Sequence, residues 1–223
     1  MSKTTFRAFV SWSGGKDSAL ACYRAMKEGV EVCYLLNMLR EDGVKSRSHG
    51  LSKELISAQA EAMGLPILQN GASWGNYEEA FKRAVSELKA YGITAGVFGD
   101  IDVEEHRAWV ERVCSELEIK PILPLWLGER EALMNEFISS GFKAVVCAVN
   151  GSFLGPQWLG REVDYDFLRD LKEFGGVDLC GEKGEYHTFV YDGPIFKHPV
   201  KFTFGEIIQE KNKFYLEIKL GGA

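Results

Sequence analysis

The sequence lacks the features that define several common protein classes. Its longest apolar runs, such as residues 142–150, fall far short of the ~20 residues that a membrane-spanning helix needs, and its first residues contain no apolar signal-peptide segment. The five cysteines are scattered and form no CxxC pair, which disfavours disulfides and zinc and favours buried thiols in a reducing compartment. We therefore expect a cytoplasmic protein without a membrane partner.

A dense block of basic residues is also absent. The chain has 223 residues, with 26 Lys and Arg against 32 Asp and Glu, and a formal net charge of −6. Because nucleic-acid binders normally present a basic face to the phosphates, this balance speaks against a nucleic-acid partner. With 46% hydrophobic residues, the chain is long enough for one large domain or for one domain plus a small one.

Strand-like and helix-like patterns alternate along the first part of the chain. Apolar strand segments are expected at residues 6–12, 30–39, 65–69, 95–101 and 121–126, and amphipathic helices at 18–27, 51–63, 76–91 and directly after 101. This rhythm predicts an α/β fold built on a doubly wound parallel sheet with helices on both faces.

The pattern changes near residue 127. A helix is expected at 128–141, a strand at 142–150, a short helix at 164–175, then glycine-rich turns, and an antiparallel strand pair at 200–207 and 213–220. We predict two domains, residues 1–127 and a smaller α+β domain at residues 128–223. The sequence does not decide the oligomeric state, and a homo-oligomer is compatible with it.

A glycine-rich segment, SGGKDS at residues 13–18, lies between the first expected strand and the first expected helix. It is not a Walker A loop, because that pattern needs Gly at Val10 and Ser or Thr at Asp17. The two glycines allow positive φ, and the N–H groups that open the helix form a nest for an anion. The segment therefore predicts a phosphate-binding loop rather than an ordinary turn.

Two other connections carry polar residues after strands. Gly99 permits a close backbone approach, and Asp100 is placed to ligate Mg²⁺, to hold a substrate group or to cap the next helix. His106, on that helix, is expected to be a surface or cap residue. His49, in the loop RSHG, either contacts phosphates or is solvated.

The stretch at residues 179–196 is the second unusual segment. It crowds polar side chains between glycines 181, 184 and 193, namely Glu182, Glu185, Tyr186, His187 and Thr188. Such a loop can bring carboxylates and an imidazole to a reactive centre. The alternative is a polar hairpin whose glycines only make turns.

These segments resemble the motifs of a known family. SGGKDS resembles the pyrophosphate loop SGGxD[ST] of the N-type ATP pyrophosphatases, in the adenine nucleotide α-hydrolase superfamily. GEKGEYHT resembles the GExGE[YF]xT signature of the diphthine–ammonia ligase family. RSHG, GVFGDI and PILPLW agree in order, so the resemblance covers essentially the whole chain. It implies the ligase core alone, as in the short archaeal members.

The resemblance implies an activity. A carboxylate attacks the α-phosphorus of ATP, pyrophosphate leaves, and ammonia displaces AMP from the acyl-adenylate to give an amide. The implied substrate is diphthine, a modified histidine on translation elongation factor 2, with ATP and Mg²⁺ as cofactors. Residues 1–127 would bind ATP and residues 128–223 the substrate. Because Ser2 stands where N-terminal glutaminases have cysteine, the expected nitrogen source is free ammonium or ammonia from a separate partner.

The resemblance also implies site residues. For ATP binding they are Ser11, Ser13, Gly14, Gly15, Lys16, Asp17, Ser18, Met38 beside adenine, His49 and Gly99. For catalysis they are Lys16, Asp17, Asp100, Glu182, Glu185 and His187, with Asp100 as the metal ligand. For substrate binding they are Glu182, Glu185, Tyr186, His187 and Thr188.

Three alternatives remain open. A tRNA-modifying enzyme with the same loop is disfavoured by the acidic balance and the missing cysteine pairs. An ATP-dependent amide ligase for a small carboxylate would need a pocket closed to larger substrates. A nucleotide sensor without turnover would not need the cluster at residues 185–187.

Overall fold

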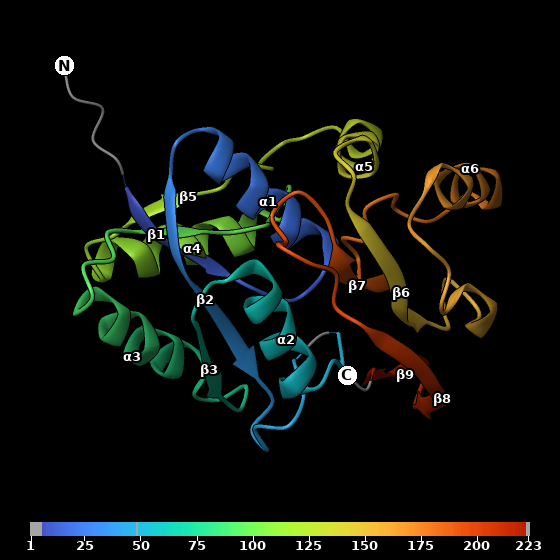
Figure 1. The fold of residues 1–223 in the computed structure, drawn as a ribbon, viewed down its shortest axis with the longest axis horizontal. Coiled ribbons are helices and arrows are strands. Elements are labelled where there is room, and N and C mark those ends of the chain that lie inside the picture. Colours follow the sequence, from blue (N-terminus) through green and yellow to red (C-terminus); the bar gives the residue numbers. More distant parts are fainter. Residues whose placement is uncertain (1–5, 48, 222–223) are drawn as a thin grey trace.

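A computed structural model describes residues 6–47 and 49–221 (Figure 1). Along the first part of the chain the elements are β1 (Arg7–Ser11), α1 (Lys16–Lys27), β2 (Glu31–Leu39), α2 (Lys53–Met63), β3 (Ile67–Gly71), α3 (Tyr77–Lys89), β4 (Ala95–Val97), α4 (Glu104–Glu116) and β5 (Lys120–Ile122). The second part contains α5 (Arg130–Ser139), β6 (Lys143–Asn150), η1 (Pro156–Trp158), α6 (Tyr165–Phe174), β7 (Tyr186–Asp192), β8 (Phe202–Glu210) and β9 (Lys213–Leu220).

The first part forms a five-stranded parallel sheet in the order β3-β2-β1-β4-β5. Helices α1 and α2 pack on one face, and α3 and α4 on the other, so both faces of the central strand β1 are covered. Its residues Ala8, Phe9 and Val10 are fully buried, as expected for a strand inside a parallel sheet. The predicted doubly wound α/β fold is confirmed.

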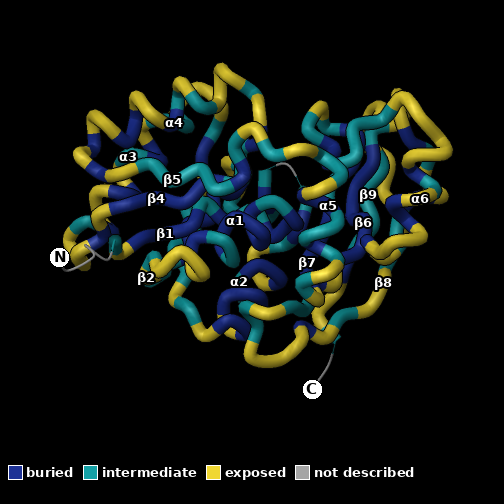
Figure 2. Tube along the Cα trace, turned by 90° about the horizontal axis from the view of Figure 1, so that it is seen from above, coloured by how far each residue is buried: buried dark blue, intermediate teal, exposed yellow. Residues whose placement is uncertain are grey.

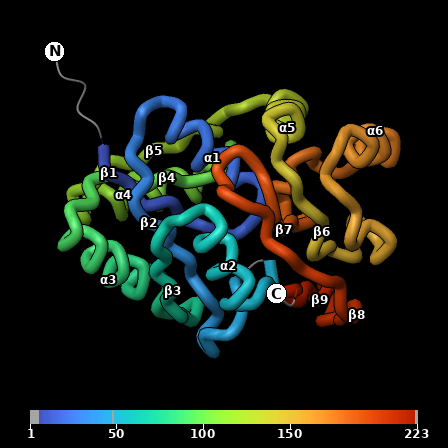
Figure 3. The backbone as a smooth tube through the Cα atoms, in the orientation of Figure 1, coloured from blue at the N-terminus to red at the C-terminus, as the bar shows by residue number. Residues whose placement is uncertain are grey.

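The second part forms an antiparallel sheet in the order β7-β6-β9-β8. The chain passes from one sheet to the other through α5 (Figure 3), and the predicted boundary at residue 127 falls between β5 and α5. One sequence expectation was wrong here. The stretch expected to form only turns contains β7, which pairs with β6.

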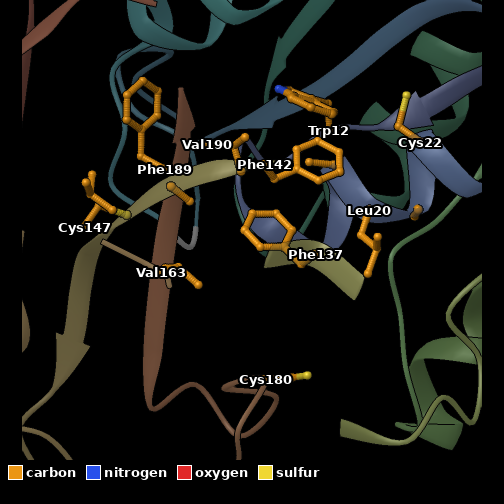
Figure 4. Packing of buried hydrophobic residues seen from close by; sticks show 14 of the residues in the cluster. Trp12, Leu20, Cys22, Phe137, Phe142, Cys147, Val163, Cys180, Phe189 and Val190 are labelled. Carbon is orange, nitrogen blue, oxygen red and sulfur yellow. The ribbon is translucent and has the colours of Figure 1, made fainter. Parts of the chain in front are cut away.

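Helices α1 and α2 lie between the two sheets (Figure 2). One buried cluster runs through both parts of the chain, and Figure 4 shows Trp12 and Leu20 from the first part beside Phe137, Phe142 and Val190 from the second. The Phe142 ring also meets Tyr23 of α1 edge-on, with centroids 5.7 Å apart. The packing therefore joins the two sheets through a common core.

The cysteines follow the sequence expectation. All five are free, and all except Cys33 are buried. Among the described helices, none combines the length and the apolar character that crossing a bilayer would require.

Candidate active site

The glycine-rich loop lies where β1 ends, at the centre of the parallel sheet. The connection after β1 leads to β2 on one side, and the later strand β4 lies on the other side of β1. The end of β1 is therefore the point where the strand order reverses, and open α/β sheets bind ligands at such a point. Gly14 has φ +85°, and α1 begins at Lys16 after Gly15, an N-cap residue that has no side chain to cap the helix. The Ser13 hydroxyl accepts a hydrogen bond from the Gly15 N–H at 3.3 Å and lies 3.1 Å from the Ser18 hydroxyl. The loop thus presents donors and the positive end of a helix to an anion.

Three glycines let the surrounding chain approach this loop closely. A Cβ on Gly15 would lie 2.4 Å from His49 Nε2, and one on Gly14 would lie 2.5 Å from Ile56 Cδ1. A Cβ on Gly99 would lie 2.9 Å from the Asp17 carbonyl carbon and 3.0 Å from the Ser18 nitrogen. The loop after β4 therefore packs directly on the first turn of α1.

A cavity of about 260 Å³ opens over the loop. It is lined by Ser11, Ser13, Lys16, Asp17, Ser18, His49, Gly99, Asp100, His106, Cys180, Gly181, Glu182, Gly184, Tyr186, His187 and Thr188. Segments from both sheets thus meet on one cavity, which we call the phosphate cavity. It unites most of the predicted site residues.

A second cavity of about 120 Å³ adjoins it at the ends of β1 and β2. It is lined by Ser11, Trp12, Ser13, Leu36, Asn37, Met38, Ser46, Arg47, His49 and Tyr77. The Arg47 guanidinium lies 4.3 Å from the Trp74 ring and 5.3 Å from the Tyr77 ring, and its Nε atom is buried without a hydrogen-bond partner in the described chain. Met38 therefore lies in a small cavity next to the phosphate cavity, as a base contact requires.

Lys16 is buried beside the phosphate cavity. Its Nζ donates to Asp17 Oδ2 at 2.9 Å and to the Cys180 carbonyl, and lies 5.1 Å from the centroid of the Tyr186 ring. Burial opposes the charge on Lys16, but Asp17, Tyr186 and Cys180 together outweigh it and raise the lysine pKa. The ammonium group therefore ties the phosphate loop to the loop at 178–184.

Strand β7 holds the phosphate loop from the other side. Thr188 Oγ1 accepts a hydrogen bond from the Lys16 N–H at 3.0 Å, and the Val190 N–H donates to the Gly14 carbonyl at 3.0 Å. Gln59 of α2, which is fully buried, donates to the Gly14 and Val190 carbonyls at 2.9 and 2.6 Å. These contacts join the two unusual sequence segments directly.

Two histidines lie together over the loop. The ring centroids of His49 and His187 are 4.7 Å apart. Burial, together with the nearby positive charge of Lys16, lowers the pKa of His187 to about 4, and burial followed by the neighbouring His187 lowers the pKa of His49 well below its ordinary value. Both rings are therefore neutral at pH 7.

Three carboxylates face the phosphate cavity, on Asp17, Asp100 and Glu182. Burial raises the pKa of Asp100, whose Oδ1 lies 3.2 Å from His106 Nδ1, while α4 begins without a side-chain cap. Burial and then the Asp17 charge raise the pKa of Glu182 to about 7. Asp100 is thus free of the capping role considered from sequence, and Glu182 titrates near neutrality.

The polar groups of Glu185 and Tyr186 are held by the backbone of the loop at 178–184. The buried Glu185 carboxylate accepts from the Asp178 N–H at 3.0 Å and the Lys183 N–H at 2.9 Å, and it does not line the cavity. The Tyr186 hydroxyl donates to the Leu179 carbonyl at 2.5 Å. Both side chains shape the loop, so direct substrate contact by Glu185, expected from sequence, has no geometric support.

The carboxylates suit a divalent cation only in part. No three histidine, cysteine or carboxylate side chains in the described residues come close enough together to hold a metal ion by themselves. Mg²⁺ is, however, commonly held by one or two carboxylates together with substrate phosphates. Asp17 and Asp100 beside an anion nest fit that pattern.

Sequence reasoning missed some residues of the site. Arg47, Asn37 and Tyr77 line the smaller cavity, and His106, expected at the surface, lies 63% exposed yet contacts Asp100. Arg47 belongs to the same RSHG segment as His49, and this proximity in sequence could have identified it as a site residue. For the others, only the fold brings them to the cavity.

Together, the parallel sheet, the anion nest at its central strand and the adjoining small cavity are typical of an α/β enzyme that binds a phosphate-bearing ligand. Two family models match the chain, the diphthamide synthase N-terminal domain over residues 6–121 and the diphthamide synthase C-terminal domain over residues 129–222. The chain belongs to the diphthine–ammonia ligase family, a family of carbon–nitrogen ligases.

Curated relatives agree. The chain is 30% identical to a diphthine–ammonia ligase of Danio rerio, an alignment that covers 84% of this chain and 83% of the relative. The chain is 31% identical to the Mus musculus protein of that name and 29% identical to the Homo sapiens protein. Each of these alignments covers 88% of this chain and 82% of the relative. A crystal structure from Methanocaldococcus jannaschii, described as a predicted subunit of tRNA methyltransferase, aligns with this chain at a TM-score of 0.46 and 17% sequence identity. The alignment covers 85% of this chain and 98% of that structure. A similarity this low supports no conclusion about function.

Proposed function

We propose that this protein amidates a carboxylate at the expense of ATP, and that the carboxylate is diphthine on translation elongation factor 2. The observation that carries the proposal is the convergence of the SGGKDS loop and the GEKGEYHT segment on one cavity, through the hydrogen bond from the Lys16 N–H to Thr188 Oγ1. The names of the relatives supply the substrate.

The reaction has two steps. A substrate carboxylate oxygen attacks the α-phosphorus, the bond to the bridging oxygen breaks, and pyrophosphate leaves with the electron pair. Ammonia then attacks the acyl carbon, the bond between that carbon and the AMP oxygen breaks, and the amide forms. The loop N–H groups and the start of α1 stabilise the charge of the leaving pyrophosphate.

The chain's residues divide these tasks. Met38 and the smaller cavity hold the base, Ser11, Ser13 and Ser18 contact phosphate oxygens, and Gly99 keeps the loop after β4 close to α1. Asp17 and Asp100 would hold Mg²⁺, which would neutralise triphosphate charge there. His49 and His187, neutral at pH 7, donate or accept hydrogen bonds without adding charge.

The test combines the protein with ATP, Mg²⁺, ammonium and elongation factor 2 carrying diphthine. AMP release and the acid-to-amide mass change on the factor are both expected, and both should require ammonium. Asp100→Asn should lower the rate about 100-fold, as for other losses of transition-state charge stabilisation. Asp166→Asn, at an exposed position on α6, is the matched control.

Each other outcome has a defined meaning. ADP formation contradicts cleavage between the α- and β-phosphates. AMP formation with a small carboxylate, but not with elongation factor 2, retains amidation and replaces the substrate.

A further inference from the structure

A third cavity, of about 540 Å³, adjoins the phosphate cavity. It is lined by Asp102, Val103, Gly128, Glu129, Arg130, Asp178, Glu182 and Lys183. Glu182 is the residue that this lining shares with the phosphate cavity. A molecule in the third cavity and a nucleotide in the phosphate cavity would therefore meet at one carboxylate.

The charge of the third cavity favours a cation. Four carboxylates and two cationic side chains line it, and Arg130 is already engaged by Asp102 at 2.7 Å and Asp178 at 2.9 Å. Excess negative charge in a partly closed space concentrates small cations.

Glu182 itself has no cationic partner in the described structure. The charged groups around it are Lys16 and Asp17 of α1, Asp100 after β4, and Arg130 of α5. Lys16 pairs with Asp17, and Arg130 pairs with the two aspartates above. The Glu182 carboxylate is thus partly buried yet unpaired, which suits a group that receives a cation from outside.

Among the acidic and basic residues of the GEKGEYHT segment, the geometry selects Glu182 as proton acceptor. The Glu185 carboxylate is occupied by two backbone N–H groups. His187 has a pKa of about 4 and is a weak base at pH 7, whereas Glu182, with a pKa of about 7, is matched to the working range of a general base.

We propose that ammonium reaches the acyl-adenylate through the third cavity, and that Glu182 binds the ion there and accepts its proton. This inference rests on the proposed amidation. One N–H bond of ammonium breaks and its proton moves to the Glu182 carboxylate. The freed lone pair forms the C–N bond to the acyl carbon, the C–O bond to AMP breaks with its electrons leaving on the phosphate, and the surplus proton on nitrogen passes to water.

The test separates the two half-reactions in Glu182→Gln. Exchange of labelled pyrophosphate into ATP, driven by the carboxylate substrate, reports adenylation without any nitrogen source. Product formation is then compared for ammonium and for hydroxylamine, which is largely uncharged near neutral pH and needs no base to free its lone pair. Glu173→Gln, at an exposed position outside every site described, is the control.

We expect Glu182→Gln to retain exchange and hydroxamate formation within about twofold, and to lose about 100-fold in kcat/KM for ammonium, the usual size of a general-base contribution. Glu182→Asp should recover part of the ammonium-dependent rate at a higher KM for ammonium. Equal losses with both nucleophiles, lost exchange, or an unchanged KM and kcat for ammonium would overturn the proposal. Absence of exchange in the wild-type protein with diphthine or any small carboxylate would refute the proposed function itself, and this inference with it.

Discussion

Gly99 has no room for a side chain, although its φ is not in the left-handed region. Its missing Cβ would contact backbone atoms of Asp17 and Ser18, and neither can rotate away. We expect Gly99→Ala to destabilise the protein by about 1–3 kcal/mol, the usual cost of overpacking, and to weaken ATP binding because the first turn of α1 shifts. Urea denaturation and ATP titration measure both effects.

Gly75→Ala is the control for this substitution. The nearest atom to a Cβ at position 75 is the Ser73 hydroxyl oxygen at 3.9 Å, an ordinary contact. Gly99→Ala with control-like stability and ATP affinity would contradict the close packing of the loop after β4 on α1.

The His49–His187 pair predicts an acid-sensitive fold. In the unfolded chain a histidine titrates near 6.5, whereas His187 in the folded protein has a pKa of about 4. The unfolded state therefore binds more protons between these values, and stability present above pH 6.5 is lost as the pH falls toward 4. For His187 the loss amounts to about 3 kcal/mol.

His187→Gln should flatten this pH dependence in the nucleotide-free protein. The measurement is the urea midpoint between about pH 7 and pH 4, with His198→Gln, at an exposed position, as the control. His49 adds to the slope, so the double variant should be flatter still. An identical slope in wild type and His187→Gln would show that the ring is not buried in its neutral form.

At the residue scale, local sequence revealed the groups whose chemistry depends on neighbours along the chain. The SGGKDS loop was recognisable because its glycines and its helix start are contiguous. The role of Gln59 was not recognisable, because in sequence it is one polar residue of an amphipathic helix. Its complete burial is explained only by Val190 of β7, which packs against it in the fold.

At the scale of elements, α2 and β7 clamp the phosphate loop through Gln59. Its carbonyl oxygen accepts from Trp12 Nε1 at 2.9 Å, and its amide nitrogen donates to the Gly14 and Val190 carbonyls. Gln59→Leu leaves the buried indole N–H without an acceptor, and should cost about 2–3 kcal/mol together with ATP affinity. The urea midpoint and ATP titration test this expectation.

Gln209→Leu, on the exposed strand β8, provides the comparison for Gln59→Leu, since among the described residues the Gln209 side chain hydrogen-bonds only to the Lys211 carbonyl. We expect it to stay within about 0.5 kcal/mol of wild type. Equal effects of the two substitutions would argue against the clamp.

Elements were predictable where one periodicity governs the whole segment. The strands and helices of the parallel sheet follow their apolar patterns, although the strand expected at 95–101 ends at Val97, where the chain leaves the sheet toward the phosphate cavity. Strand β7 was missed because glycines flank it and polar residues such as His187 interrupt it. Its pairing with β6 lies far away in sequence and left no local signal.

At the scale of the whole molecule, the shared core makes the two sheets depend on each other. Phe137, Phe142 and Val190 share one buried cluster with residues of α1 and α2, whose apolar faces would otherwise meet water. We therefore expect a single unfolding transition in scanning calorimetry, with equal calorimetric and van't Hoff enthalpies. Two resolved transitions would show that residues 1–127 and 128–223 are independent units.

The hydrogen bond from the Lys16 N–H to Thr188 also bears on how the protein is made. The loop emerges from the ribosome early, but the residue that fixes its first helical N–H lies 172 positions later. A nascent chain can form β1 and α1, yet it holds the loop unfinished until β7 has been synthesised. Competence to bind a nucleotide should therefore arise only after β7 has left the ribosome, and every earlier intermediate carries an open, unclamped loop.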